Sequence, residues 1–462
     1  MSPPARTLLV VSVAVFMATL DLFIVNIAFP EIRAEWPASS LAGMSWILNA
    51  YAIVYAAFLV VAGRIADRVG RRRAFIVGLA TFTAASALCA AATSVELLVA
   101  ARVLQAVGAA IVTPTSLAIL LHAFPPARRA AAIGAWAAIG GIAAAAGPPL
   151  GGALVEGSWR LIFLLNMPVG LAALAVAGRT LVESREETSR EWPDAAGAVL
   201  LTAAIGAVAL GFVKAPEWGW GDARVVGAFL AGAVGVALVL GRSARHPSPV
   251  VDLEMLRVRS FAFANAAILA FFAAVAAMLL GGALFLTGAW GDGILRAGLS
   301  LAPGPLMAAI VAGPAGRIAG QVGAGRVAAF GSAVYAAGCA WWALRLGSEP
   351  DYAGAFLPGI LLTGVGVGAT LPTLAAAATA SLPPTRLATG SAVFTMSRQV
   401  GAVVGVAVLV AIIGTPAPGE AADAFVAGWW FMAAAGVVAA VLALAVGGLR
   451  RTAAPTVAEA RA

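Results

Sequence analysis

The sequence predicts an all-α membrane protein in which fourteen transmembrane helices form two six-helix bundles, with a helix pair inserted between them. Two observations support this fold class. Of the 462 residues, 62% are apolar and only 11% are charged, whereas about a quarter of the residues in an ordinary soluble domain are charged. A short motif also occurs twice, in the two halves of the chain. An internal repeat of this kind predicts a duplicated architecture.

Fourteen apolar runs supply the predicted helices, because a helix needs about 20 mostly apolar residues to cross a hydrocarbon layer about 30 Å thick. The first run is too long for the core of a signal peptide, and no small-residue cleavage site follows it, so we expect it to remain as a membrane span. The expected spans cover residues 7–29, 44–62, 74–93, 95–121, 130–154, 160–178, 195–213, 224–241, 261–287, 299–315, 327–344, 353–380, 387–413 and 424–446.

The distribution of basic residues predicts the orientation of these spans, since Lys and Arg tend to remain on the cytoplasmic side of a membrane. If the N-terminus is cytoplasmic, the cytoplasmic segments hold 21 of the 29 Lys and Arg residues and the outer segments hold six. We therefore expect a multi-pass protein of the bacterial plasma (inner) membrane with both termini in the cytoplasm. The net charge of +8 then reflects topology, and we expect no nucleic acid partner.

An internal repeat predicts how the spans are grouped. Residues 63–70 (GRIADRVG) follow the second span and residues 316–323 (GRIAGQVG) follow the tenth, with six of eight positions identical. Both copies fall on the cytoplasmic side, as a parallel duplication requires; the alternative is a chance likeness of two glycine-rich turns. Eight spans separate the copies rather than six, which indicates an inserted pair. The expected regions are an N-terminal six-helix bundle (1–178), an inserted helix pair with linkers (179–259), a C-terminal six-helix bundle (260–448) and a cytoplasmic tail (449–462).

Cysteine and histidine are too few and too widely spaced for several classes of site. Cys89 and Cys339 lie far apart, as do His122 and His246, which excludes a disulfide framework and a cysteine-ligated metal site. No Walker loop is present, so we do not expect ATP to drive the protein. A membrane enzyme would need clustered acids, histidines or a nucleophile–base pair at membrane depth, and a receptor would need a large extramembrane domain. The sequence shows neither feature.

Asp21 is the only carboxylate well inside an expected span, and an ionisable residue in the membrane is a functional candidate by default. Asp21 lies about 12 Å from the outer end of span 1, and Arg102 lies about 10 Å from the outer start of span 4. Burial favours the neutral acid, whereas a neighbouring cation favours the carboxylate. We therefore predict that Asp21 exchanges a proton and that Arg102 stabilises its charged form. The alternative is a static pair that only holds two helices together.

The first copy of the repeat predicts a cytoplasmic gate. Gly63 and Gly70 are expected to allow tight backbone turns. Asp67 is expected to approach the N-terminus of span 13, because a helix N-terminus attracts an anion, and so to latch the two bundles together. Arg68 and Arg71 would hold neighbouring helix ends. In the second copy a glycine replaces the acid, so the latch should be one-sided; the alternative is that these arginines only fix topology.

Arg398 lies near the middle of span 13, and the sequence places no acid of the second half at its depth. A cation there needs an aqueous cavity or backbone carbonyls. The sequence leaves open whether Arg398 contacts substrate, contacts Asp21 or packs as a structural cation. Four further candidates for a substrate cavity, each equally compatible with a packing role, are Asn26, Trp46, Tyr51 and Gln105.

Five segments within the first 170 residues match known motifs in order along the chain. Together they make the chain resemble the major facilitator superfamily, and within it the fourteen-spanning drug:proton antiporter branch of multidrug efflux type. One departure is Ala106, which stands where a glycine usually follows the span 4 motif. The segments are residues 20–30 (LDLFIVNIAFP), 63–73 (GRIADRVGRRR), 102–105 (RVLQ), 147–152 (GPPLGG) and 159–170 (WRLIFLLNMPVG).

The resemblance adds a role for the glycine- and proline-rich part of span 5. Proline removes a helix hydrogen bond and bends the axis, and small residues let helices approach closely. In the family that the chain resembles, this bend seals the cavity against proton leak during antiport. The alternative is ordinary close packing of membrane helices. The residues concerned are Gly147, Pro148, Gly151 and Gly152.

The residues and the resemblance together predict a proton-coupled secondary active exporter that releases amphipathic organic compounds or drugs by alternating access, and not an enzyme. We expect no cofactor other than the coupling proton. The expected partners are the lipid bilayer, a small amphipathic substrate and protons, and we expect a monomer. With a single intramembrane acid, neutral or monovalent substrates are favoured. The alternatives are a dedicated exporter of one endogenous metabolite and a proton symporter on the same fold.

Overall fold

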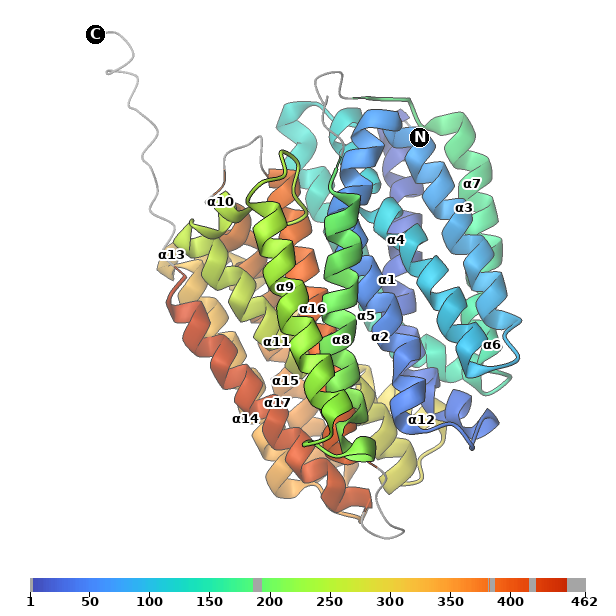
Figure 1. The fold of residues 1–462 in the computed structure, drawn as a ribbon, viewed down its shortest axis with the longest axis vertical. Coiled ribbons are helices and arrows are strands. Elements are labelled where there is room, and N and C mark those ends of the chain that lie inside the picture. Colours follow the sequence, from blue (N-terminus) through green and yellow to red (C-terminus); the bar gives the residue numbers. More distant parts are fainter. Residues whose placement is uncertain (1–2, 186–192, 381, 383–386, 415–420, 447–462) are drawn as a thin grey trace.

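The computed structural model describes residues 3–185, 193–380, 382, 387–414 and 421–446. Nearly all of these residues are helical, and this part of the chain contains no strand. The helices run roughly side by side along the long axis of the molecule (Figure 1). In chain order they are α1 (Pro3–Glu35), α2 (Leu41–Val69), α3 (Arg71–Ala90), α4 (Val95–Ala123), α5 (Pro126–Val155), α6 (Arg160–Leu164), α7 (Asn166–Thr180), α8 (Ala195–Trp218), α9 (Ala223–Ser243), α10 (Leu253–Leu256), α11 (Arg259–Leu284), the π-helix η1 (Phe285–Ala289), α12 (Ile294–Leu301), α13 (Pro303–Val322), α14 (Ala324–Arg345), the π-helix η2 (Tyr352–Phe356), α15 (Leu357–Ala380), α16 (Leu387–Ile413) and α17 (Ala421–Leu444).

Within the described residues, thirteen helical stretches are long and apolar enough to cross a membrane. Each corresponds to one of the expected spans. The remaining expected span, 130–154, falls within α5, of which the stretch Ile142–Val155 is apolar but short. The helical prediction is confirmed, and the total of fourteen spans remains a prediction.

Most helices extend beyond the apolar runs that predicted them. The run 7–29 lies inside α1, and the run 299–315 lies inside a stretch that begins at Ile294 and ends at Val322. An apolar run marks only the part of a helix that lies in hydrocarbon, whereas backbone hydrogen bonds continue into the polar region beyond it. The sequence therefore located the helices but underestimated their lengths.

Prolines explain two interruptions that the apolar pattern did not reveal. The expected span 160–178 is divided into α6 and α7 at Leu165, and Pro168 follows in the first turn of α7. The expected span 299–315 is divided into α12 and α13 at Ala302, directly before Pro303. Proline lacks an N–H group and its ring collides with the carbonyl four residues earlier, so it favours the first turn of a helix and disfavours the interior.

Helices α1–α7 pack mainly on one another, and so do α11 and α13–α17, whereas the short helix α12 packs mainly against α5. The closest associations in the first group pair α3 with α4, α2 with α4 and α1 with α5, while those in the second group pair α14 with α15, α11 with α16 and α14 with α17. The two groups meet where α2 packs against α16, α5 against α12 and α1 against α11. The molecule is thus built from two helical groups joined along a shared face.

Glycines allow the two groups to touch at the end of the molecule where α6 and α12 lie (Figure 1). A Cβ atom on Gly152 of α5 would lie 2.9 Å from the Cα of Leu295 in α12. In turn, a Cβ atom on Gly298 of α12 would collide with the carbonyl oxygen of Pro148 in α5. These contacts hold the two groups together at this end in the conformation described.

The helix pair α8–α9 lies across the join between the two groups. α8 packs against α9, α2 and α16. Asp194 caps α8 by accepting from the backbone N–H of Gly197 at 2.7 Å and pairs with Nε of Arg242 near the end of α9 at 2.6 Å. Burial raises the pKa of Asp194, but the hydrogen bonds from Arg242 and Gly197 outweigh it and hold the pKa below its ordinary value. The ion pair between Asp194 and Arg242 thereby joins the start of α8 to the end of α9.

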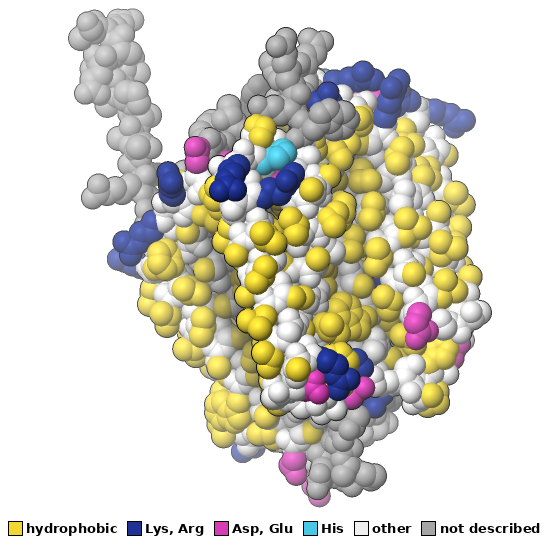
Figure 2. All heavy atoms as spheres, in the orientation of Figure 1, with side chains coloured by type: hydrophobic (Ala, Val, Ile, Leu, Met, Phe, Trp, Pro, Cys, Tyr) yellow, Lys and Arg dark blue, Asp and Glu magenta, His cyan; other side chains and the backbone are white. Residues whose placement is uncertain are grey.

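The face shown in Figure 2 has a broad apolar band between two more polar ends. Lys and Arg side chains gather at the end where the N-terminus lies, and the apolar side chains of α9 belong to the band, with Leu230 61% and Val234 58% exposed. Such exposure would be unfavourable in water but suits a surface that faces lipid.

Candidate functional site

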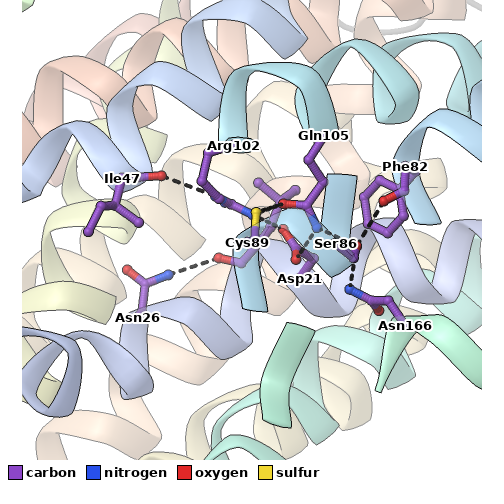
Figure 3. Close-up of polar contacts among 10 residues, drawn as sticks. Asp21, Asn26, Ile47, Phe82, Ser86, Cys89, Arg102, Gln105 and Asn166 are labelled. Atoms are coloured by element: carbon purple, nitrogen blue, oxygen red, sulfur yellow. Dashed lines mark hydrogen bonds and ion pairs between the residues drawn. The ribbon is translucent and has the colours of Figure 1, made fainter. Parts of the chain in front are cut away.

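Asp21 and Arg102 meet in the interior of the first helical group. Asp21 lies midway along α1 and Arg102 lies in the first third of α4, and each residue is only 1% exposed. Nη1 of Arg102 donates to Oδ2 of Asp21 in a buried ion pair (Figure 3). The structure thus brings together the two side chains that the sequence placed at a shared depth.

Gln105, one turn along α4, completes the surroundings of the carboxylate. Its Nε2 donates to Oδ1 of Asp21 at 2.9 Å and to Oγ of Ser86 in α3 at 2.9 Å. Its Oε1 accepts from Nη1 of Arg102 at 2.6 Å. Nδ2 of Asn166, the first residue of α7, donates to the same Ser86 oxygen at 3.2 Å (Figure 3). Donors from α4 therefore hold both carboxylate oxygens, and the network reaches α3 and α7.

Two groups from α2 hold the guanidinium of Arg102 independently of the acid. Its Nε donates to the backbone carbonyl of Ile47 at 3.1 Å, and its Cζ lies 4.0 Å from the centre of the Tyr51 ring. Tyr51 stacks on Tyr55 with ring centres 6.0 Å apart, and its own hydroxyl is buried without a hydrogen-bond partner. Tyr51 contributes the face of its ring, which attracts a cation. Arg102 would remain fixed to α2 if Asp21 were neutralised.

Two of the candidate cavity residues lie apart from this network. Nδ2 of Asn26 donates to the carbonyl of Leu22 at 2.8 Å, within α1 itself. Trp46 lines a surface hollow of about 570 Å³ at the start of α2 and α4, with Ser40 and Glu96 among its other lining residues. Tyr51 and Gln105 belong to the network around Asp21, whereas Asn26 and Trp46 do not.

Ser86 and Asn166 belong to the network but were not predicted from the sequence. Ser86 is one of several small polar residues in the apolar run of span 3, beside Thr81 and Thr83, and the sequence does not indicate which of them has a partner. Asn166 lies in one of the motif segments, but that segment does not reveal which helix it faces. Both connections depend on how α3, α4 and α7 pack, which is tertiary information.

The expectation of a tight turn at Gly63 is wrong. Gly63 lies within α2, which continues without a break to Val69, and a Cβ atom on Gly63 would lie 3.3 Å from the Cβ of Pro114 in α4. No residue between Gly63 and Val69 terminates the helix, and the glycine instead permits close packing of α2 on α4. The turn between α2 and α3 depends on Gly70 alone.

Gly70 has φ 114°, a conformation that side-chain-bearing residues rarely adopt. The matching position in the second copy of the repeat, Gly323, has φ 103° and connects α13 to α14. Each of these glycines donates its N–H to the carbonyl four residues earlier. The repeat seen in the sequence is therefore also a repeat of backbone geometry.

The other predicted gate residues, Asp67, Arg68 and Arg71, lie beside this turn. Oδ1 of Asp67 accepts from Nε of Arg71 at 2.7 Å, across the junction of α2 and α3, and Arg68 lies in the last turn of α2. Residues 383–386, which lead into span 13, lie outside the described residues, and the approach of Asp67 to the start of that span remains a prediction. The structure thus gives Asp67 a partner within its own helical group.

Glu183 is a further acid at this turn that the sequence analysis did not single out. Its carboxylate accepts from the backbone N–H groups of Arg72 at 3.1 Å and Arg73 at 3.3 Å, in the first turn of α3. A carboxylate at a helix N-terminus satisfies free N–H groups and interacts favourably with the helix dipole. The segment that follows α7 is thereby docked onto the start of α3.

The glycines of span 5 lie against α1 close to Asp21. A Cβ atom on Gly147 would lie 2.7 Å from the Cβ of Phe23, and one on Gly151 would lie 2.8 Å from Cγ1 of Ile24. α5 therefore presses on the turn of α1 that follows the acid, while Gly152 faces α12 of the other group. Pro148 is inside this helix, which is continuous over Pro126–Val155.

Arg398 lies on α16 and forms neither an ion pair nor a hydrogen bond within the described part of the chain. Its Cζ lies 5.1 Å from the centre of the Phe272 ring in α11, and its Nε is buried without a hydrogen-bond partner. It is not a partner of Asp21, whose contacts come from Arg102 and Gln105.

The described residues also contain no cluster of three His, Cys, Asp or Glu side chains that could hold a metal ion.

Comparison with known proteins identifies the family. The model of the Major Facilitator Superfamily matches residues 11–406. The chain belongs to the major facilitator superfamily. This family comprises membrane transporters. The chain is therefore a multi-pass membrane transporter and not an enzyme.

Several relatives in the superfamily carry names that refer to resistance or export. The multidrug resistance protein Stp of Mycobacterium tuberculosis is 34% identical over 409 residues, which cover 88% of this chain and 75% of the relative. The methylenomycin A resistance protein of Bacillus subtilis is 32% identical and covers 94% of this chain and 92% of the relative. The tetracenomycin C resistance and export protein of Streptomyces glaucescens is 41% identical over 255 residues, with coverage of 55% and 47%.

Solved structures support the fold. A crystal structure of an autoinhibited peptide transporter of the POT family aligns with 98% of this chain and 98% of its own, with a TM-score of 0.68 at 17% sequence identity. At this level of identity the likeness concerns the arrangement of helices and not the transported compound.

Proposed function

We propose that the chain is a proton-coupled antiporter that exports small amphipathic compounds across a bacterial plasma membrane by alternating access. The observation that carries this proposal is the Asp21–Arg102 pair, which is almost completely buried at membrane depth. Removing two charges from water is costly, and an apolar contact would hold α1 to α4 at lower cost. A carboxylate that is both buried and fully hydrogen-bonded is suited to releasing one of its partners when it gains a proton.

The contacts around Asp21 suggest what protonation changes. A neutral carboxyl loses its attraction for Arg102, but Arg102 keeps the carbonyl of Ile47, the Tyr51 ring and Oε1 of Gln105. Protonation would therefore weaken the hold of α2 and α4 on α1 without freeing the guanidinium. Because α5 packs against α1 just beyond Asp21 and also against α12, a shift of α1 has a contiguous packed route to the second helical group.

The closed end of the molecule supports alternating access. In the topology we propose, with fourteen spans and both termini cytoplasmic, the contacts of Gly152 and Gly298 between α5 and α12 lie at the outer end. The conformation described is then closed toward the outside, and Asp21 is sealed from solvent within it. Proton exchange requires a second conformation, which rocking of two six-helix bundles (1–178 and 260–448) about the pair in 179–259 would provide.

We assign the cytoplasmic gate to the turn at Gly70. Asp67 lies near the end of α2, a helix that packs against α16 of the other group, and this supports a role for the acid at the join between the groups. A switch of Asp67 between Arg71 and the start of span 13 would open and close this end. The bend of span 5 at Gly147, Pro148, Gly151 and Gly152 would limit proton leak by keeping α5 tightly against α1.

Substrate breadth separates two versions of the proposal. The name of the relative Stp refers to multidrug resistance, which favours broad recognition of amphipathic compounds. Other relatives are named for one compound each, among them a probable actinorhodin transporter and a cephamycin export protein, and these favour a dedicated exporter of one endogenous metabolite. We propose that the protein acts as a monomer in the bilayer and needs no cofactor besides the coupling proton.

Transport in reconstituted proteoliposomes tests the function. An imposed pH gradient should drive uptake of fluorescent amphipathic probes against their concentration gradient, in exchange for protons, and nigericin should abolish uptake by collapsing the gradient. Proton movement in the opposite direction to the probe supports antiport. Co-movement of proton and probe would establish a symporter, and uptake that ignores the pH gradient would contradict proton coupling.

A further inference from the structure

Arg398 differs from every other charged group at membrane depth in the described part of the chain because no acid neutralises it. It lies 11 residues into α16, or about 17 Å along the helix axis, close to the midpoint of the span. It is deep among surrounding side chains yet keeps part of its surface accessible, and its Nε is buried without a hydrogen-bond partner. An unpaired guanidinium in such a place is unfavourable unless a ligand supplies the missing negative charge and hydrogen-bond acceptors.

The surroundings of Arg398 are aromatic and lie at the join between the two helical groups. Its guanidinium carbon lies 5.1 Å from the centre of the Phe272 ring in α11. Tyr55, which stacks on Tyr51, lies on α2, the helix of the other group that packs against α16. α16 packs against α2 of the other group and carries Arg398 near its middle, and alternating access places a substrate near the midplane between the halves.

The charge balance at this depth indicates the sign of the ligand. Asp21 and Arg102 neutralise each other, so Arg398 leaves one net positive charge at membrane depth among the described residues. In a region of low dielectric constant this charge repels a cationic compound and attracts an anionic one. A guanidinium also presents N–H groups in a planar fork that matches the two oxygens of a carboxylate.

We propose that Arg398 binds the carboxylate of the exported compound, and that the preferred substrates are therefore monoanionic amphipathic molecules with an aromatic body. The proposal rests on the exporter function proposed above and specifies its substrate class. The aromatic rings of Phe272 and Tyr55 supply contact area for the apolar body, and Arg398 supplies the charge complement. An inside-negative membrane potential favours both inward movement of a proton and outward movement of an anion, so the exchange gains driving force from both charges.

A matched set of dansyl probes tests this inference in the full-length protein in proteoliposomes. Dansylglycine carries a carboxylate, dansylamide is neutral and dansylcadaverine carries an ammonium group, while the fluorophore is the same in all three. With an imposed pH gradient we expect dansylglycine to be transported about 10-fold or more faster than dansylcadaverine, with dansylamide between them.

Substitution of Arg398 separates recognition from packing. Arg398→Gln should lower transport of dansylglycine about 10- to 100-fold, as expected for the loss of one charge-assisted hydrogen-bonded pair, and should change transport of dansylamide less than about 3-fold. Arg398→Lys should restore part of the anion preference. The control is Arg345→Gln, because Arg345 also stacks on a ring, that of Trp341 at 5.5 Å, but is exposed at the end of α14. It should leave all three rates unchanged.

The outcomes distinguish this inference from the proposed function. If no probe responds to the pH gradient, the proposed function fails. If the neutral or cationic probe is transported and the anion is not, the exporter function stands and the anionic substrate class is refuted. Equal loss of all three probes in Arg398→Gln, with the protein still folded, would show a structural cation and would also refute the inference.

Discussion

The two helical groups share a turn of the same backbone geometry but carry their interior charges in opposite ways. The turn between α2 and α3 and the turn between α13 and α14 each contain a glycine with a positive φ, at Gly70 and Gly323. In the first group the interior cation, Arg102, is paired with Asp21. In the second group Arg398 has no acidic partner within the described residues.

This difference suggests a division of labour between the groups. The turn geometry is common to the two groups, whereas the placement of charge differs between them, and each buried ion must be neutralised by some partner. A pair within one group can be switched by a proton. A lone cation at the join between the groups instead needs a ligand from outside. In our account the first group couples the proton and the second recognises the substrate.

Replacing each arginine with glutamine should give the largest contrast. Arg102→Gln leaves the carboxylate of Asp21 buried without its cation, which should cost about 3–5 kcal/mol of stability. Arg398→Gln removes a charge that has no partner, so stability should be unchanged or increased. Thermal unfolding of the purified proteins in detergent measures both. A comparable loss in the two variants would show that Arg398 is a structural cation and would remove the contrast.

The coupling role of the first group is tested by Asp21→Asn. This substitution keeps an acceptor for Arg102 but cannot exchange a proton, so transport driven by a pH gradient should fall at least about 100-fold, or about 2.7 kcal/mol, while the protein remains folded. The control is Glu31→Gln, since Glu31 lies on the same helix but is exposed. It should transport as well as the unmodified protein. Retained active transport in Asp21→Asn would contradict proton coupling through this acid.

The two turns offer a comparison at the level of the backbone. Gly323→Ala places a side chain in a conformation that favours glycine and should cost about 1–3 kcal/mol. Gly70→Ala should cost more, because its Cβ would also lie 2.7 Å from the carboxylate of Glu183 and would dislodge it from the start of α3. Unfolding temperatures report the difference. Equal effects in the two variants would mean that the Glu183 contact adds nothing.

The smallest expected effect concerns Asp194, which fastens the helix pair α8–α9. Its pKa is held below the ordinary value of 3.8, so the ion pair with Arg242 stabilises the folded state above that pH and the contribution disappears as pH falls through the lowered pKa. Asp194→Asn should lower stability by about 1 kcal/mol at pH 7. The difference from the unmodified protein should shrink below about pH 4. A difference that does not vary with pH would exclude the ionised pair as its cause.

Much of the fold could be predicted from the sequence because lipid imposes a simple rule. Each apolar run long enough to cross hydrocarbon became helical, and the last glycine of each copy of the repeated motif, Gly70 and Gly323, marked equivalent turns. Helix ends were less predictable, since polar residues such as those between Gly63 and Val69 continue a helix outside the apolar layer. The breaks at Leu165 and Ala302 depend on prolines that a hydropathy pattern does not register.

The site was predictable only in part for the same physical reason. A lone acid in an apolar run identified Asp21, and a matching depth identified Arg102. The contributions of Ser86, Asn166 and the carbonyl of Ile47 come from helices that are adjacent only after folding. Asn26 donates to a carbonyl of its own helix, and Trp46 lines a surface hollow. Sequence spacing alone does not show that neither residue contacts the network around Asp21.

The most direct test of the account is to observe the proton on Asp21. Infrared difference spectroscopy of the reconstituted protein during pH titration detects the carbonyl stretch of a protonated carboxyl group. Our account predicts a reversible carboxyl band that is lost in Asp21→Asn and retained in Glu31→Gln. A band that persists in Asp21→Asn, or a carboxylate that never protonates over the pH range in which transport occurs, would contradict the central claim.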